Sequence, residues 1–290
     1  MPVVSNGYHA LPVELWGEIF NHVDEIDLWF TCRQVSRLLR SEAEREMTAH
    51  RLQKLNFRSH FHAKIELHGE ITHVLGIIMN PKLENISKDK PRVLYKFQVA
   101  FAPDLVTAQA EEELLGMIKY RLDEFKISDL DFVERDSRGM SGRQTHIDNF
   151  MNKIEIPGLE IDAAAKELSF EWRPFLDQFF AEEAYVRHMR PRSALTEDER
   201  LENAERTLRK EGKDFTSRNF GRLLAENELA DREIWERAYG LRLKRAFRNA
   251  GLVLDVEIYR DVIRRHCATM DTARWVIRIE RFMESRGYTD

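Results

Sequence analysis

The chain has 290 residues, with 45 lysine and arginine residues against 50 aspartate and glutamate residues and a formal net charge of −5. This acidic balance argues against a nucleic-acid partner, which needs a basic surface for its phosphates, and it gives no reason to expect a membrane partner. Hydrophobic residues make up 43% and charged residues 33% of the chain, which indicates a folded protein with long amphipathic helices.

The cysteine content and the apolar runs suggest where the protein resides. Cys32 and Cys267 lie far apart, and we expect two reduced thiols in an intracellular compartment. No apolar run is long enough to span a bilayer, and residues 1–10 lack the charged start and apolar core of a signal peptide. The sequence therefore predicts a protein of the cytoplasm, the nucleus or both.

Residues 11–51 predict three short helices. A proline at the first helical position, here Pro12, suits the start of the first helix. Apolar residues recur at three- and four-residue spacing from Leu15 to Val23, which indicates one apolar stripe. We expect Asp27 to cap the second helix and Ser36 the third. These short helices carry apolar residues on more than one face, so they need a partner within the chain or outside it.

The order of these residues resembles the F-box family. The elements of the family occur in order as Leu11-Pro12, Glu14-Leu15, Ile19-Phe20, Asp27-Leu28 and Val35-Ser36-Arg37. Many F-boxes carry tryptophan three residues after that serine, where this chain has Leu39. The replacement keeps an apolar anchor but loses ring area, so we expect a lower affinity for the partner.

F-box segments dock on the Skp adaptor of Skp–cullin–F-box ubiquitin ligases, while the rest of the chain selects a substrate. The resemblance therefore implies a non-catalytic, protein-binding subunit of the ubiquitin conjugation pathway. This substrate receptor would reach a cullin through the adaptor and recruit a protein that the sequence does not identify. The residues expected to face the adaptor are Leu11, Pro12, Leu15, Ile19, Phe20, Leu28, Val35, Leu38 and Leu39.

Other interpretations of the same residues stay open. Residues 31–40 superficially resemble the second half of a helix-turn-helix DNA reader, although no glycine lies between Asp24 and Leu39 for its tight turn. The segment could also belong to an F-box-like interaction protein that binds the adaptor outside any ligase. It could equally be an ordinary helical subdomain, and an enzyme with a pocket in the middle of the chain is a further alternative.

Residues 56–190 predict a small α+β domain with a mainly antiparallel sheet. The strict alternation from Val93 to Phe101 is the clearest strand pattern, and residues 108–125 carry the apolar stripe of a helix. We expect turn-rich chain from Asn80 to Pro91 and an exposed loop from Arg135 to Asn149. Further strands are expected at residues 65–67, 71–79, 132–133, 154–156, 159–161 and 168–172, with a turn at Pro157-Gly158.

Helices are predicted for residues 175–189 and from Thr196 onward. Thr196 with Glu199 forms a capping box, and Gly212 is the matching stop. Five capped helices are expected in total, the last three beginning at Asp231, Asp255 and Asp271. The segments SFEWRPF and YVRHMRPR are also similar to those of fungal F-box proteins.

The predicted fold class is α+β, mostly α. We expect a three-helix F-box at residues 8–55, the α+β domain at 56–190 and a helical C-terminal region at 191–290. The last two could pack as one domain. No fixed repeat period supports a solenoid.

We predict no catalytic residue, no cofactor and no metal. His60 and His62, with His68 and His73 nearby, are joined by no cysteine or paired carboxylates that would complete a zinc site. The motifs of serine hydrolases, zinc proteases and dinucleotide-binding folds do not occur. Glu182-Glu183, like residues 111–113, is interpreted as part of a solvated helix face.

Two predicted helices near the C-terminus are rich in basic residues. One carries Arg237, Arg242, Lys244, Arg245 and Arg248, and the next carries Arg260, Arg264 and Arg265. They could form a solvated face balanced by nearby acidic residues. They could instead form a surface that recruits an acidic or phosphorylated segment of a substrate through arginine pairing.

Overall fold

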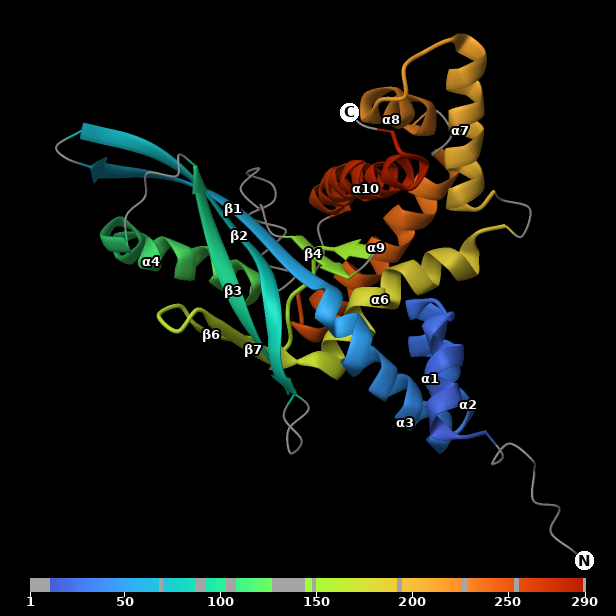
Figure 1. Cartoon of the computed structure of the whole chain (residues 1–290), viewed down its shortest axis with the longest axis horizontal. Coiled ribbons are helices and arrows are strands. Elements are labelled where there is room, and N and C mark those ends of the chain that lie inside the picture. The colour runs from blue at the N-terminus through green and yellow to red at the C-terminus, as the bar shows by residue number, and fades with distance from the viewer. Residues whose placement is uncertain are drawn as a thin grey trace, which may run out of the picture.

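The computed structural model describes residues 11–67, 70–86, 92–102, 108–126, 144–147, 150–191, 195–225, 229–252 and 256–288. The fold is α+β and mostly α, as predicted. Helices form both ends of the described chain, and an antiparallel sheet lies between them in sequence (Figure 1).

The three predicted N-terminal helices are present. Helix α1 (Val13–Asn21) is followed by a π-helical segment (Asp27–Cys32) that continues into α2 (Arg33–Val35). Helix α3 (Arg37–Glu46) extends through a second π-helical segment (Met47–Arg51) and a 3₁₀ turn (Leu52–Lys54).

The caps of these helices agree with the sequence in one case and differ in the other. Ser36 caps α3 as predicted, since its Oγ accepts a hydrogen bond of 3.1 Å from the backbone N–H of Leu39. The prediction that Asp27 caps the second helix is wrong. Asp24 Oδ1 accepts hydrogen bonds of 3.0 Å from the backbone N–H groups of Ile26 and Asp27, because the helix begins three residues earlier than predicted.

In the described part of the chain, seven strands form one sheet in the order β5-β4-β1-β2-β3-β7-β6. Each neighbouring pair is antiparallel. The strands are β1 (Leu55–Leu67), β2 (Glu70–Ile86), β3 (Arg92–Ala102), β4 (Gln144–Ile147), β5 (Phe150–Asn152), β6 (Glu160–Asp162) and β7 (Glu167–Glu171). The first three are the long strands that dominate the sheet in Figure 1.

Two strands run where the sequence predicted turns and loops. β2 continues through the predicted turn-rich segment as far as Ile86, with register shifts between Met79 and Lys82 and between Leu83 and Asn85. Such irregularities accommodate Pro81, which has no N–H to donate to a ladder. β4 lies within the predicted loop and pairs with residues 55–58 of β1. The strand and loop predictions for residues 127–143 lie outside the described residues.

The predicted strand at Ile154 and Ile156 is wrong. Both side chains are buried, but their backbone forms no strand, and Ile156 N–H donates to the carbonyl oxygen of Phe125 instead. The alternating apolar pattern here reflects an irregular segment packed against the core.

The turn that follows is present as predicted. Gly158 has a φ of +63°, and an added Cβ would come within 3.2 Å of the Glu171 side chain.

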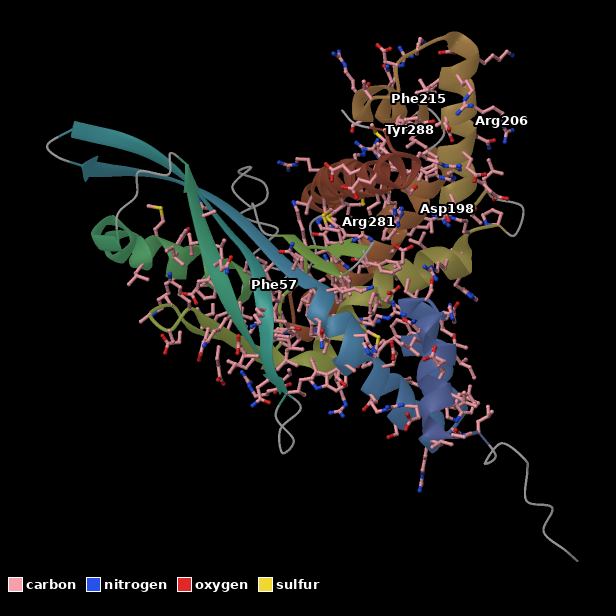
Figure 2. All side chains as sticks on the ribbon, viewed as in Figure 1. Phe57, Asp198, Arg206, Phe215, Arg281 and Tyr288 are labelled. Atoms are coloured by element: carbon pink, nitrogen blue, oxygen red, sulfur yellow. The ribbon has the colours of Figure 1, made fainter. Side chains whose placement is uncertain are left out.

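One face of the sheet is buried. Alternate residues on five strands point into the core: Phe57, Ile78, Val93, Tyr95, Phe97, Thr145, Ile147, Leu168 and Phe170. Phe125, after helix α4 (Ala108–Asp123), and Phe175, from helix α6 (Trp172–Met189), place their rings 5.5 and 6.5 Å from that of Phe57. Figure 2 shows Phe57 near the middle of the molecule. The intervening β3 residues Lys96, Gln98 and Ala100 are exposed.

The core under the sheet continues into the N-terminal helices. Leu28, Trp29, Met47 and Leu52 are each at most 1% exposed and belong to the same cluster of buried side chains as the sheet residues. The buried hydroxyl of Tyr95 also donates a 2.8 Å hydrogen bond to the carbonyl oxygen of Leu52. The N-terminal helices are therefore packed on the sheet, and the domain division at residues 55 and 56 stays a prediction.

The described C-terminal part forms α7 (Glu197–Glu211), α8 (Ser217–Ala225), α9 (Leu229–Asn249) and α10 (Val256–Arg286). The capping box of Thr196 and Glu199 is confirmed, and Gly212 ends α7 in the left-handed conformation. Two predicted caps are wrong, since Asp231 lies inside the first turn of α9 and Asp271 lies inside α10. The apolar face of α10 continues on both sides of Asp271, with no glycine or proline to end the helix there.

Helix α10 contributes to two further buried clusters. Its first half packs with α6 and α9 around Tyr239 and Val262, and its second half packs with α7 and α8 around Phe220 and Ile279. At the far end of α10, Phe215 and Tyr288 stack with ring centroids 4.6 Å apart (Figure 2). The domain division at residues 190 and 191 also stays a prediction.

Arg51 joins the three N-terminal helices from inside. Its guanidinium forms a 2.8 Å ion pair with Glu25, and both side chains are 9% exposed. It also donates to the carbonyl oxygens of Asn21 and Val23 at 3.3 Å and of Phe20 at 3.4 Å. The last carbonyls of a helix have no partner within it, so Arg51 satisfies the end of α1 from the third helix.

The ion pair predicts a coupled effect on stability. We expect Arg51→Met to lower the free energy of unfolding by about 3–5 kcal/mol, because Glu25 is then buried without a counter-charge. The double variant with Glu25→Leu should recover part of this loss. Urea unfolding measures both, with the exposed Arg37→Met on α3 as the control. Additive effects of the two substitutions would contradict the coupling.

Candidate functional site

Large apolar side chains are exposed on the N-terminal helices. Leu11, Leu15, Ile19, Val35 and Leu38 are between 40% and 67% exposed. They are five of the ten large hydrophobic residues found exposed among the described residues, although they occupy only the first 28 residues of the described chain. This concentration marks a contact surface, since isolated exposed apolar residues are common but a cluster is not.

The exposed residues come from two places that the fold brings together. Leu15 and Ile19 lie one turn apart on α1, while Val35 and Leu38 flank the extended residue Ser36 between α2 and α3. Helices α1 and α3 pack on each other, and α1, α2 and α3 lie together at one end of the molecule (Figure 1). Among the other predicted adaptor residues, Pro12 is exposed and Leu39 is half-buried.

Two of the predicted adaptor residues do not lie on this surface. Phe20 is 3% exposed and Leu28 is 0% exposed, and both belong to the buried core. Phe20 follows Ile19 directly, but one residue is about 100° of rotation on a helix, so the two side chains face different surroundings. Phe20 and Leu28 therefore support the exposed residues from within, and a contact of either with the adaptor stays a prediction.

The same helices are held against α6 by a charged contact. The carboxylate of Glu44 on α3 lies between two arginines. One of its oxygens accepts hydrogen bonds of 2.9 and 3.2 Å from Arg33, and the other accepts bonds of 2.9 and 3.0 Å from Arg173 on α6. Each arginine uses two nitrogens, a geometry that fixes orientation as well as distance.

An aromatic contact accompanies the charged one. Trp29 is 1% exposed, and its indole N–H donates a 2.8 Å hydrogen bond to Asp177 on α6. The guanidinium of Arg33 lies 3.6 Å from the centre of the Trp29 ring, and the Trp172 ring lies 5.8 Å away. Asp24 also forms an ion pair with Arg187 near the other end of α6. The exposed apolar surface is thus connected to α6 along much of that helix.

Sequence reasoning missed this contact because its partners lie far apart in the chain. Glu44 and Arg173 are separated by 129 residues, and Trp29 and Asp177 by 148. No local spacing relates such residues. The one available signal was Arg173 beside Trp172, between the strand predicted to end at residue 172 and the helix predicted from residue 175, and this signal is not specific.

Glu182 and Glu183 do not form the solvated face that the sequence predicted. They are 4% and 7% exposed, and Glu182 forms a 3.1 Å ion pair with Arg242 on α9. The reason is that α6 is covered on one side by the sheet core and on another by α9. The side chains of residues 111–113 lie outside the described part.

The described residues contain no group of three or more His, Cys, Asp and Glu side chains that could hold a metal ion. Within the same ranges, no helix combines the length and apolar character needed to cross a membrane.

The environment of Glu44 shifts its titration. Burial raises the pKa of this carboxyl, but the hydrogen bonds and charges of Arg173 and Arg33 outweigh burial and leave the pKa below its ordinary value of 4.5. The contact between α3 and α6 therefore depends on an ionised Glu44.

This shift predicts a pH dependence of stability. A carboxyl whose pKa is lower in the folded state stabilises the fold above its unfolded pKa, and this contribution is lost as pH falls through the folded pKa. We expect Glu44→Gln to be less stable than wild type at neutral pH. The difference between the two proteins should shrink as pH falls below about 4.5. Urea unfolding at a series of pH values measures this, and a constant difference would contradict it.

Comparison with known protein families matches the F-box domain to residues 9–45. No curated protein and no solved structure matches the chain. The matched residues comprise α1, α2 and most of α3, which carry the exposed apolar side chains. F-box domains bind Skp adaptors within Skp–cullin–F-box ubiquitin ligases, and F-box proteins are typically non-catalytic. The chain therefore carries an N-terminal F-box domain, which its first helices form.

Proposed function

We propose that the protein is the substrate receptor of a Skp–cullin–F-box ubiquitin ligase. Its F-box docks on a Skp adaptor, through which it reaches a cullin, and the rest of the chain recruits a protein substrate. The observation that carries this proposal is the cluster of large apolar residues exposed at F-box positions on α1 and around Ser36.

The adaptor surface is defined by the predicted residues that the fold leaves exposed or half-exposed. They are Leu11, Pro12, Leu15, Ile19, Val35, Leu38 and Leu39. Removing one large apolar side chain from water contributes roughly 1.5–3 kcal/mol, so burial of several would give a strong driving force for docking. Phe20 and Leu28 hold this surface in shape from the core.

The role in ubiquitin transfer is positional. A receptor that holds a substrate near the charged conjugating enzyme raises the effective concentration of the reacting groups and needs no catalytic side chain of its own. The contacts of Trp29, Arg33 and Glu44 with α6 support this role. They fasten the adaptor surface to the body of the protein, so a substrate bound there would keep a defined position relative to the adaptor.

A protein that binds the adaptor outside any ligase would use the same surface, and co-precipitation of a cullin distinguishes the two. The geometry of Arg33 argues against DNA binding through residues 31–40. Arg33 is engaged by Glu44 and Trp29 rather than presented to a phosphate backbone.

Adaptor binding is tested by Ile19→Asp. The substituted carboxylate would lie on the contact surface, where its desolvation should weaken binding by several kcal/mol, that is, by more than about a hundredfold. Co-purification with a Skp adaptor and titration of the purified partners measure the change. Leu252→Asp, at an exposed leucine outside the residues matched to the F-box, is the matched control and should bind like wild type. Equal binding by Ile19→Asp and wild type would overturn the proposal.

The buried F-box residues predict a different outcome. Phe20→Ala should lower the free energy of unfolding by about 3–5 kcal/mol, because it leaves a cavity in the core. Binding by the fraction that stays folded should be reduced far less than in Ile19→Asp. Thermal unfolding and adaptor titration on the same samples separate the two effects. A variant that is as stable as wild type but cannot bind would show that Phe20 contacts the adaptor directly.

A further inference from the structure

A cavity of about 670 Å³ opens between α6, α9 and α10. Four basic residues line it: Arg237 and Lys244 from α9, and Arg260 and Arg264 from α10. The apolar lining is formed by Tyr185, Leu241 and Ile263. We call this cavity the basic groove. It lies in the part of the chain that the F-box match does not reach.

Helix geometry aligns the basic residues in two rows. Arg237, Leu241 and Lys244 are separated by four and three positions, so they share one face of α9. Arg260 and Arg264, four positions apart, share one face of α10. The two helices pack on each other through the buried cluster that includes Ile263. The rows therefore border a common space.

Three arginines of the groove have no acidic partner in the described part of the chain. Among the described residues, no ion pair or hydrogen bond joins Arg237, Arg260 or Arg264 to an acidic side chain. Two acids, Glu233 and Glu236, also line the cavity. Glu236 forms a 3.8 Å ion pair with Arg232, which is not one of the lining residues. Glu233 and Glu236 therefore form no ion pair with these arginines, and the side chains of Glu257 and Asp261, on the helix that carries Arg260 and Arg264, lie outside the described residues.

We propose that the basic groove binds an acidic segment of a partner protein, one that carries carboxylate or phosphate groups. This proposal rests on the receptor function, since it names the chemistry by which the C-terminal region would recruit its substrate. A guanidinium matches both carboxylate and phosphate with two parallel hydrogen bonds. Leu241, which is 48% exposed, and Tyr185 offer apolar contacts to the residues beside the anionic one.

A peptide fits the groove better than a nucleic acid does. Glu233 and Glu236 line the same space and would repel a continuous phosphate backbone, whereas a single acidic side chain can be placed among the arginines. The net charge of −5 also gives the protein little long-range attraction for a polyanion. The apolar side chains suit a chain of mixed character, as in a protein segment.

The test uses the full chain and fluorescein-labelled probes. They are an oligoglutamate peptide, a degenerate peptide library with one fixed phosphoserine, the same library with serine at that position, and a DNA duplex. Fluorescence anisotropy measures binding at low and at raised salt. The groove variant is Arg237→Glu with Arg264→Glu. The matched control is Arg248→Glu, an exposed arginine on α9 that does not line the cavity.

We expect the phosphoserine library, the oligoglutamate peptide or both to bind wild type more tightly than the serine library, with an affinity that falls as salt rises. The groove variant should bind at least about tenfold more weakly, and Arg248→Glu should match wild type. Binding of both anionic probes would assign the site to negative charge in general. Binding of the phosphoserine library alone would assign it to phosphate.

Three results would overturn the proposal: no binding of either anionic probe, equal weakening by the groove and control variants, or tighter groove-dependent binding of a DNA duplex than of the peptides. Adaptor titration of the same variants keeps the two proposals separate. The groove variant should still bind the Skp adaptor, which also shows that it is folded. If the wild-type protein binds the peptides but does not bind the adaptor, the proposed receptor function is wrong and the proposal for the groove stands.

Discussion

Helix α6 is buried on two sides, and the arrangement of the rest of the molecule depends on this constraint. Phe175 and Phe179 pack under the sheet, while Trp172 contacts Trp29 of the F-box. Near its C-terminal end, Val186 belongs to the cluster that α6 shares with α9 and α10. A helix that is buried on one face only could slide or tilt. Contacts on two sides of α6 restrict both movements. The F-box, the sheet and the C-terminal helices therefore share one reference element.

This shared helix determines how two dissimilar surfaces are related. The F-box exposes apolar side chains that the described residues leave uncovered, and the basic groove exposes guanidinium groups that pair with no acidic side chain of the described residues. Burial of apolar area is strong but not directional, whereas arginine pairing is directional and selects for charge. A receptor needs the first for constitutive docking on a common adaptor and the second for discrimination among substrates. Tyr185 on α6 lines the groove, and Trp172 of the same helix contacts the F-box.

Local chemistry in the sequence was sufficient to predict several of the elements, but not which way their side chains face. Ser36, the Thr196 capping box and the alternation of β3 act within a few residues, and each is present as predicted. The orientation of Phe20 against Ile19 depends on the core that forms beneath α1, whose other members come from the whole first two-thirds of the chain. The pairing of Glu182 with Arg242 likewise depends on the packing of α9 on α6.

The basic residues of α9 show most clearly how packing divides a uniform sequence pattern. Arg237 and Arg242 look alike in the sequence, with acidic neighbours at helical spacing. Arg242 turns toward α6, where it pairs with Glu182 and reaches the backbone carbonyl of Lys153 at 3.1 Å. Five positions along a helix amount to about 140° beyond a full turn, so Arg237 cannot follow it into that contact and lines the groove instead. One arginine is thus used to hold the fold together, and the other keeps its hydrogen-bonding capacity for a ligand.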